Sequence, residues 1–325
     1  MTFFLGVDVG GTKTHAVIVD ADGRVLGFGH GGPGNPQGVG QEGLYAVLRQ
    51  STTEALRQAG VALTDLAGAG LAIAGYDWPS DLAPMAATLD RVGLACPYQI
   101  VNDAVPGIVI GAHDGWGISV VAGTGCNCRG WDRERRREGR ITGYGYMMGE
   151  AAGSSELIAR AMQLVNFAWI KRTGPTTLTQ AFIDHVGARD EEDLIAGYTT
   201  GRYAIGAESA AVVFRVAEQG DGTAQDLIDW AGQELGELVK AVARQLDFQA
   251  LAFDVVLVGG MFAGGPRLID SLDRTVRAFA PQARLVRLTA PPVLGAALIG
   301  LEQAGLRPTD ATRATLIATA ETVRS

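Results

Sequence analysis

The chain begins with two short apolar segments, residues 3–9 and 14–20, and a glycine-rich turn separates them. Apolar runs of this length that contain β-branched residues predict buried strands. A third strand is expected over residues 24–29, after the Asp22-Gly23 turn. The chain therefore opens with three strands in succession.

Farther along the chain, apolar strands alternate with segments of helical periodicity. The pattern predicts helices over residues 40–59, 81–92 and 104–112, and strands over residues 67–74 and 98–101. Alternation of this kind is typical of a mostly parallel sheet covered by helices. The sequence therefore predicts an α/β protein.

The strand pattern begins again at Gly115-Trp116-Gly117. Strands are expected over residues 118–122, 126–131 and 140–143, and the first of them ends in the turn Gly123-Thr124-Gly125. This succession repeats that of the opening strands. We interpret it as a structural duplication with a domain boundary near residue 115.

The expected domains are residues 1–115 and residues 116–305, the second with a helical insertion over about residues 153–249. The tail, about residues 306–325, is weakly helical and is a candidate to pack on the first domain. After the insertion, the pattern predicts strands over residues 254–258 and 284–288 and helices over residues 267–279 and 293–303.

Composition places the chain among globular proteins. Its 325 residues suffice for two cores, and 47% of them are hydrophobic and 19% charged. The net charge of −8 argues against nucleic acid or an acidic membrane as a partner. The three cysteines do not form a disulfide framework, the four histidines lack metal-ligand spacing, and no apolar run is long enough to span a membrane. We therefore expect a cytoplasmic protein.

The turn after the first strand carries the chemistry of a phosphate site. Gly10, Gly11, Thr12 and Lys13 combine bare backbone N–H groups, a hydroxyl and an ammonium group, and Asp8 lies just before them. A phosphate requires this close backbone approach and positive charge. Because a strand follows instead of a helix, the turn is not a Walker A loop. The alternative is an ordinary glycine hairpin with a solvated lysine, which Asp8 and the second glycine turn disfavour.

Five loops that are expected to follow buried strands carry glycine or carboxylate residues. They come after Val9, Val101, Ala122, Gly143 and Val258. Ligands of open α/β sheets collect at the carboxyl ends of strands. The five loops therefore predict one cleft between the two domains.

Asp103 is the best candidate for a catalytic base. It follows a strand that ends in Asn102 and precedes a helix. Capping the helix is the alternative role, and both roles are compatible. Phosphoryl transfer to an alcohol requires a group that aligns the hydroxyl and accepts its proton.

Four segments carry a resemblance to a known family. They are Gly-Val-Asp-Val-Gly-Gly-Thr-Lys-Thr at 6–14, Val-Asn-Asp-Ala at 101–104, Ala-Gly-Thr-Gly-Cys-Asn-Cys-Arg at 122–129 and Gly-Tyr-Gly-Tyr-Met-Met-Gly-Glu at 143–150. The chain resembles the N-acetylglucosamine kinases of the BadF/BadG/BcrA/BcrD ATPase family, in the superfamily of sugar kinases, heat-shock ATPases and actin. The resemblance implies two actin-like (ribonuclease H-like) domains with an interdomain cleft. It also implies phosphorylation of the 6-hydroxyl of N-acetylglucosamine or glucosamine by ATP, with Mg²⁺, in a homodimer.

The resemblance further implies a role for each matching residue. Asp103 is the expected base, and Asp8 is expected to position Mg²⁺. The implied sugar-binding residues are Asn35, Asp103, Cys126, Asn127, Gly143, Tyr144, Gly145 and Glu150. The implied ATP-binding residues are Gly10, Gly11, Thr12, Lys13, Thr124, Gln219, Gly259, Gly260 and Ala263.

Three departures from the family pattern lie on the sugar side. Tyr144 stands where the family usually has tryptophan, and Cys126 where serine is common. The run Gly-Glu-Ala-Ala-Gly at 149–153 replaces Gly-Asp-Glu-Gly-Ser. These departures bear on the identity of the sugar and not on the kinase chemistry.

Two other functions stay open. Activator ATPases of the same family couple ATP hydrolysis to electron transfer through an iron–sulfur cluster, which requires a cysteine from each of two separated loops. Here Cys126 and Cys128 lie on one expected strand, and Cys96 precedes a proline before another. This spacing does not favour converging thiolates. A sugar-sensing regulator has little support, since no helix-turn-helix segment precedes Phe3.

Overall fold

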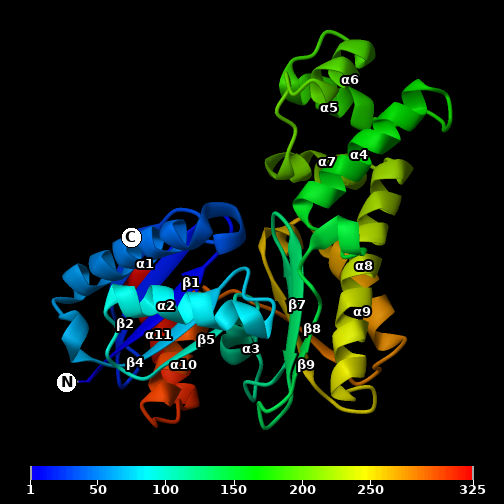
Figure 1. Ribbon diagram of the computed structural model, residues 1–325. Coiled ribbons are helices and arrows are strands. Elements are labelled where there is room, and N and C mark those ends of the chain that lie inside the picture. Colours follow the sequence, from blue (N-terminus) through cyan, green and yellow to red (C-terminus); the bar gives the residue numbers. More distant parts are fainter. Residues whose placement is uncertain (1, 324–325) are drawn as a thin grey trace. The chain divides into compact units, whose positions relative to one another are not determined.

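The computed structural model describes residues 2–323, which form two compact units (Figure 1). Unit 1 consists of Met1–Ser119, Arg129–Glu138 and Leu288–Ser325, and unit 2 of Val120–Cys128 and Gly139–Arg287. Residues 288–305, which the sequence-based division places in the second domain, thus belong to unit 1. The reason is that α10 (Val293–Gln303) packs against strands of that unit.

The first sheet consists, in order, of β3 (Val25–Gly31), β2 (Thr14–Asp20), β1 (Phe3–Val9), β4 (Leu66–Ile73) and β5 (Tyr98–Asn102). β1 pairs antiparallel with β2, and β2 with β3. β1 and β4 are parallel, as are β4 and β5. The carboxyl ends of β1, β4 and β5 therefore lie next to one another at one edge of the sheet.

The second sheet consists, in order, of β10 (Arg284–Arg287), β9 (Asp254–Val258), β6 (Gly117–Ala122), β7 (Cys126–Trp131) and β8 (Glu138–Arg140). When the strands are numbered from the start of each repeat, this order is the same as that of the first sheet. The predicted α/β class and the predicted duplication are both confirmed.

Helices pack closely on the first sheet because glycines allow it. α1 (Pro36–Ala59) lies against β3, and α10 lies against β4 and β1. A side-chain carbon at Gly29 would lie 1.9 Å from the Ser51 carbonyl oxygen, and one at Gly6 would lie 2.4 Å from the Ala297 nitrogen. The remaining helices of unit 1 are α2 (Leu82–Val92), α3 (Val105–Gly111) and α11 (Asp310–Val323), and α11 packs against β3.

Unit 2 is mostly helical outside its strands. Its helices are α4 (Ser154–Trp169), α5 (Leu178–Val186), α6 (Glu191–Thr199), α7 (Ala210–Glu218), α8 (Gly222–Leu246) and α9 (Pro266–Arg277). α8 packs along α9, while α5 and α6 lie at the end of the unit away from β7 and β9 (Figure 1). The segment predicted to be helical, residues 153–249, holds α4 to α8. Short 3-10 helices include η3 (Gly145–Met148) and η5 (Gly260–Ala263).

The prediction of a strand over residues 140–143 is wrong, because β8 ends at Arg140. After Ile141, the backbone N–H groups of Thr142 and Tyr144 donate to the carboxylate of Glu150 and not to a neighbouring strand. Gly143 therefore belongs to a loop that does not directly follow a strand. Within residues 2–323, none of the helices has both the length and the apolar content needed to cross a bilayer.

Candidate functional site

The turn after β1 is closed by backbone hydrogen bonds and open toward solvent. The Gly10 N–H donates to the Lys13 carbonyl (2.9 Å), and the Gly34 N–H donates to the Gly10 carbonyl (3.0 Å). Gly11, Thr12 and Lys13 are exposed. A side-chain carbon at Gly11 would meet no atom of the described residues within 4 Å. The space over this turn can therefore admit a phosphate.

Asp8 and Asp103, at the ends of β1 and β5, are close enough to influence each other's charge. The pKa of Asp8 is raised to about 7, chiefly by burial and then by the Asp103 carboxylate, while Lys13 opposes the rise. Two carboxylates in one place favour a bound cation, because a cation stabilises their ionised forms.

The turn that carries Asp103 is held by its neighbour. The Ala104 N–H donates to Asn102 Oδ1 (3.0 Å), and Asn102 is buried. The N-cap of α3 is Ala104, without a side-chain capping bond. The structure thus places the N-cap of α3 at Ala104, one residue after Asp103.

Asn35 caps α1. Its Oδ1 accepts a hydrogen bond from the Gln37 N–H (2.9 Å), and Pro36 occupies the first helical position. Gly75, at φ +84°, passes so close that a side-chain carbon there would lie 2.4 Å from Asn35 Oδ1. The oxygen of Asn35 thus serves the helix, and its amide nitrogen is the group that can donate to a ligand.

A carboxylate that the sequence analysis missed lies among these loops. Asp77 is buried and accepts hydrogen bonds from Gln37 Nε2 (3.0 Å) and Asn102 Nδ2 (3.3 Å). It also pairs with the buried Arg129, whose Nη2 lies 2.7 Å from Asp77 Oδ1. The available signal was its place just after β4, the same kind of position that singled out Asp8 and Asp103.

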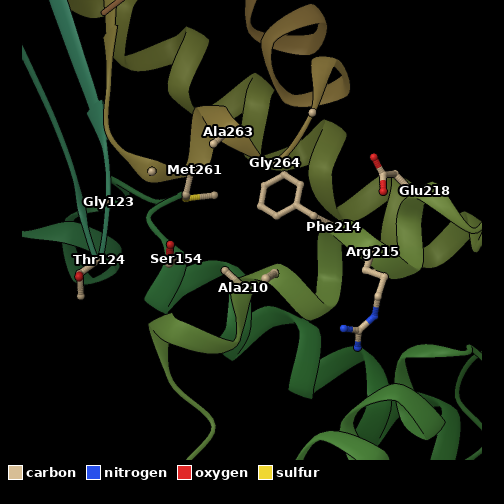
Figure 2. A pocket seen from close by; sticks show the side chains of 13 residues that line it. Gly123, Thr124, Ser154, Ala210, Phe214, Arg215, Glu218, Met261, Ala263 and Gly264 are labelled. Atoms are coloured by element: carbon tan, nitrogen blue, oxygen red, sulfur yellow. The ribbon is translucent and has the colours of Figure 1, made fainter. Parts of the chain in front are cut away.

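Unit 2 holds a cavity of about 610 Å³ between the turn after β6, α7 and η5 (Figure 2). Of the residues expected to bind ATP, Thr124, Gly260 and Ala263 line it. Gln219 and Gly259 are not in the lining formed by the described residues. The lining residues that the sequence analysis missed are Ser154, Ala210, Ala211, Phe214, Arg215, Glu218, Met261, Gly264 and Gly265. The amphipathic pattern of α7 was the only signal for several of them.

The glycine turn after β6 is joined to the start of α4. The Ser154 N–H donates to the Gly123 carbonyl (2.8 Å), and the Ser155 N–H donates to the Thr124 carbonyl (2.9 Å). The cavity therefore has the amino-terminal end of a helix at its edge, next to Thr124. The partial positive charge of such an end stabilises anions.

Gly259 has a structural part in this site. At φ +115°, a side-chain carbon there would lie 2.3 Å from the Ala122 carbonyl oxygen, so glycine lets the end of β9 approach β6. Gly264 similarly approaches Phe214, whose ring would lie 2.5 Å from a side-chain carbon at that position. Figure 2 shows the Phe214 ring beside Gly264.

Glu150, expected to bind the sugar, is buried and holds a loop. Its carboxylate accepts hydrogen bonds from the Thr142 N–H (2.6 Å), the Thr142 hydroxyl (2.9 Å) and the Tyr144 N–H (3.1 Å). These bonds fix the segment that contains Gly143, Tyr144 and Gly145. Tyr144 itself is half exposed. Glu150 is thus placed to position the loop.

Cys126 and Asn127 are engaged within unit 2. The buried Cys126 thiol donates to the Ala151 carbonyl (3.2 Å). The pKa of this thiol is raised to about 12, first by burial and then by the Glu156 carboxylate. Asn127 Oδ1 accepts from the Cys128 N–H (2.8 Å). Cys126 is therefore a neutral donor at physiological pH.

Comparison with known proteins gives a consistent assignment. A sequence model of the BadF/BadG/BcrA/BcrD ATPase family matches residues 5–300. An N-acetyl-D-glucosamine kinase of Dictyostelium discoideum is 27% identical over 311 residues, which cover 92% of this chain and 97% of the relative. An N-acetylmuramic acid/N-acetylglucosamine kinase of Clostridium acetobutylicum is 26% identical over 304 residues, covering 92% of this chain and 98% of the relative.

Solved structures support the fold. The structure of a proposed N-acetylglucosamine kinase from Chromobacterium violaceum has a TM-score of 0.70 at 27% identity, covering 92% of this chain and 99% of its own. A ROK family glucokinase from Streptomyces griseus, solved with glucose and AMPPNP, has a TM-score of 0.62 at 18% identity. It covers 92% of this chain and 99% of its own, and at that identity it bears on the fold alone.

Proposed function

Because the chain belongs to the BadF/BadG/BcrA/BcrD ATPase family, we propose that this sugar kinase transfers the γ-phosphate of ATP to the 6-hydroxyl of an amino sugar, N-acetylglucosamine or glucosamine. The observation that carries the proposal is the pair Asp8 and Asp103 at the carboxyl ends of β1 and β5, two strands of one sheet that flank β4, beside an open glycine turn. A carboxylate base beside a phosphate site is the arrangement that phosphoryl transfer to an alcohol needs.

The cavity of unit 2 is the proposed place of the adenosine part of ATP. Its volume of about 610 Å³ is within the range of pockets that hold such ligands. Phe214 and Met261 offer apolar surface to a base, and Thr124 lies where the helix end favours phosphate. In unit 1, Gly10 to Lys13 offer N–H, hydroxyl and ammonium donors of the kind that bind phosphate. Gln219 and Gly259 do not line the cavity, so we propose that they affect ATP binding through the adjacent lining residues Glu218 and Gly260.

In the proposed reaction, Asp103 accepts the proton of the sugar 6-hydroxyl as its oxygen bonds to the γ-phosphorus. The bond between that phosphorus and the β,γ-bridging oxygen breaks, and ADP leaves. The Asn102 bond to the backbone after Asp103 holds the base in place. Lys13 neutralises charge on the phosphates.

The residues present fit a magnesium ion that comes with ATP. Mg²⁺ is usually held by one or two carboxylates together with substrate phosphates and water. Asp8 supplies such a carboxylate, and no group of three or more His, Cys, Asp or Glu residues converges within the described part of the chain. When bound, Mg²⁺ neutralises phosphate charge, and Asp8 is proposed to orient it.

The sugar contacts proposed in unit 1 are the Asn35 amide nitrogen and Asp103. In unit 2, the loop of Gly143, Tyr144 and Gly145 is proposed to bind sugar on the family resemblance alone. Glu150 holds that loop through three hydrogen bonds. Cys126 and Asn127, also expected on the sugar side, lie at the start of β7. The names of the two curated relatives support an N-acetylated amino sugar as the substrate.

The activator ATPase is the weaker alternative. Iron–sulfur ligation requires thiolates that converge on one point, whereas Cys126 and Cys128 both lie on β7 and the buried Cys126 thiol donates to the Ala151 carbonyl. The three cysteines are all free thiols, and Cys128 is buried.

A coupled assay of ADP release tests the proposed function. ADP release from Mg²⁺-ATP is measured without sugar and with glucose, glucosamine, N-acetylglucosamine and N-acetylmuramic acid. Strong stimulation by an amino sugar is expected, and Asp103→Asn should lower kcat by about 10²–10⁴-fold without weakening ATP binding. Rapid ADP release that no sugar stimulates would favour the activator ATPase.

A further inference from the structure

We propose that Asp77 is a positioning residue that sets the geometry of both the sugar-binding Asn35 and the base Asp103. The inference rests on the proposed function, because it assigns Asp77 a task in that reaction. It adds a residue to which neither the sequence motifs nor the family resemblance gives a role.

Asp77 joins three strand-end loops of unit 1. It follows β4 and bonds to Gln37, which comes after β3, and to Asn102, at the end of β5. Oδ2 accepts from Gln37 Nε2 (3.0 Å), and Oδ1 accepts from Asn102 Nδ2 (3.3 Å) and Arg129 Nη2 (2.7 Å). Both oxygens of one buried carboxylate are thus used to connect separate segments.

The first connection leads to Asn35. The side chain of Gln37 donates to Asp77, while its backbone N–H donates to Asn35 Oδ1. At Gly75, two residues before Asp77, a side-chain carbon would lie 2.4 Å from the same oxygen, so this loop passes close to Asn35. The orientation of the Asn35 amide, and hence of the nitrogen proposed to meet the sugar, depends on where Asp77 holds Gln37.

The second connection leads to Asp103. Asn102 Nδ2 donates to Asp77 and to the Tyr76 carbonyl (3.1 Å), while Asn102 Oδ1 accepts from the Ala104 N–H. The side chain of Asn102 therefore ties the backbone on both sides of Asp103 to the loop of Asp77. A displacement of Asp77 would move the base, and a misplacement of about 1 Å can cost about 100-fold in rate.

The charge of the buried Asp77 is balanced by the buried Arg129. Its side chain is 1% exposed and that of Asp77 is 6% exposed, so each needs the other's charge. Arg129 Nη1 also lies 3.2 Å from Glu138 Oε1. The ion pair holds Oδ1 of Asp77, while Gln37 holds Oδ2.

A purely structural ion pair is the competing explanation, and a matched control separates the two. Asp193 is also buried and pairs with an arginine, since Arg202 Nη2 lies 2.6 Å from its Oδ1. It lies on α6, within the helical part of unit 2. Asp193→Asn should therefore lower stability and leave the sugar kinetics unchanged.

The test compares steady-state kinetics of four variants. Asp77→Asn should lower kcat/KM for the sugar by about 100-fold while the KM for ATP stays unchanged. Gln37→Met, at an exposed residue, should raise only the KM for sugar, by about tenfold. Asn102→Ala should lower chiefly kcat, by about 10–100-fold. If Asp77→Asn resembles Asp193→Asn, with a lower Tm and wild-type sugar kinetics, the inference is overturned.

Hydrogen exchange of the ligand-free protein gives a readout that needs no substrate. Asp77→Asn should speed exchange of the Gln37 and Ala104 amides, whereas Gln37→Met should affect only the first of these loops. If the wild-type protein phosphorylates no sugar, the proposed function fails, and this exchange pattern still decides the role of Asp77. Unchanged exchange at both amides in Asp77→Asn would contradict it.

Discussion

Replacing Asp8 by asparagine should change how the stability of the ligand-free protein depends on pH. The pKa of Asp8 is raised from 3.8 to about 7 in the folded state, first by burial and second by Asp103. Between these two pH values the folded state binds a proton that the unfolded state has lost. The free energy of unfolding therefore falls as pH rises through this window.

The size of the effect follows from the pKa interval. At about 1.36 kcal/mol per pH unit, the interval from 3.8 to about 7 corresponds to about 4 kcal/mol. The contribution is fully present below pH 3.8 and is lost above about pH 7. Asparagine does not titrate, so Asp8→Asn should gain stability relative to wild type by up to about 4 kcal/mol between pH 4 and pH 8.

Urea unfolding at several pH values, with a metal chelator present, measures this difference. Asp22→Asn, at the exposed hairpin turn before β3, is the control and should follow the wild-type curve. A difference between Asp8→Asn and wild type that stays constant from pH 4 to pH 8 would refute the reasoning. It would mean that Asp8 is ionised in the folded protein across this range.

Four further outcomes are expected. Gly11→Val should fold normally, because a side chain there meets no described atom, but calorimetry should show that it no longer binds ATP. The control Gly174→Val, at an equally open position, should bind ATP normally. Glu150→Gln should raise the KM for sugar by about tenfold by loosening its loop, and an unchanged KM would contradict the positioning role. Iodoacetamide should label Cys96 before Cys126, whose pKa is raised to about 12 and which is the more buried of the two; mass spectrometry decides. Light scattering should give the mass of a homodimer, and a monomer at micromolar concentration would remove that prediction.

The parts of the fold set by local sequence were predictable. The strands around Gly10 and Gly123 follow from short apolar runs that end in glycine, and the repeated order of these runs implied two similar sheets. β8 was predicted too far along the chain, at residues 140–143 and not at Glu138–Arg140, because Ile141 continues the apolar pattern. What ends the strand is a hydrogen bond from Thr142 to Glu150, eight residues later, which no local pattern contains.

The sequence singled out Asp8 and Asp103 as candidates because each is a carboxylate at the end of a predicted strand, and their roles stay predictions. The pairing of Asp77 with Arg129 joins residues 52 positions apart, and it depends on which strand ends the fold brings together. Phe214 carries no polar chemistry, and its place in the cavity depends on how α7 packs beside η5. These parts of the site required the tertiary structure.

The most direct test of the central claim compares N-acetylglucosamine with its 6-deoxy analogue in the presence of Mg²⁺-ATP. Phosphorus NMR should show a sugar 6-phosphate and ADP in equal amounts with the first. With the analogue, which lacks the 6-hydroxyl, it should show no phosphorylated sugar. Phosphorylation of the analogue, or ADP formation at the same rate with both sugars, would contradict transfer to the 6-hydroxyl.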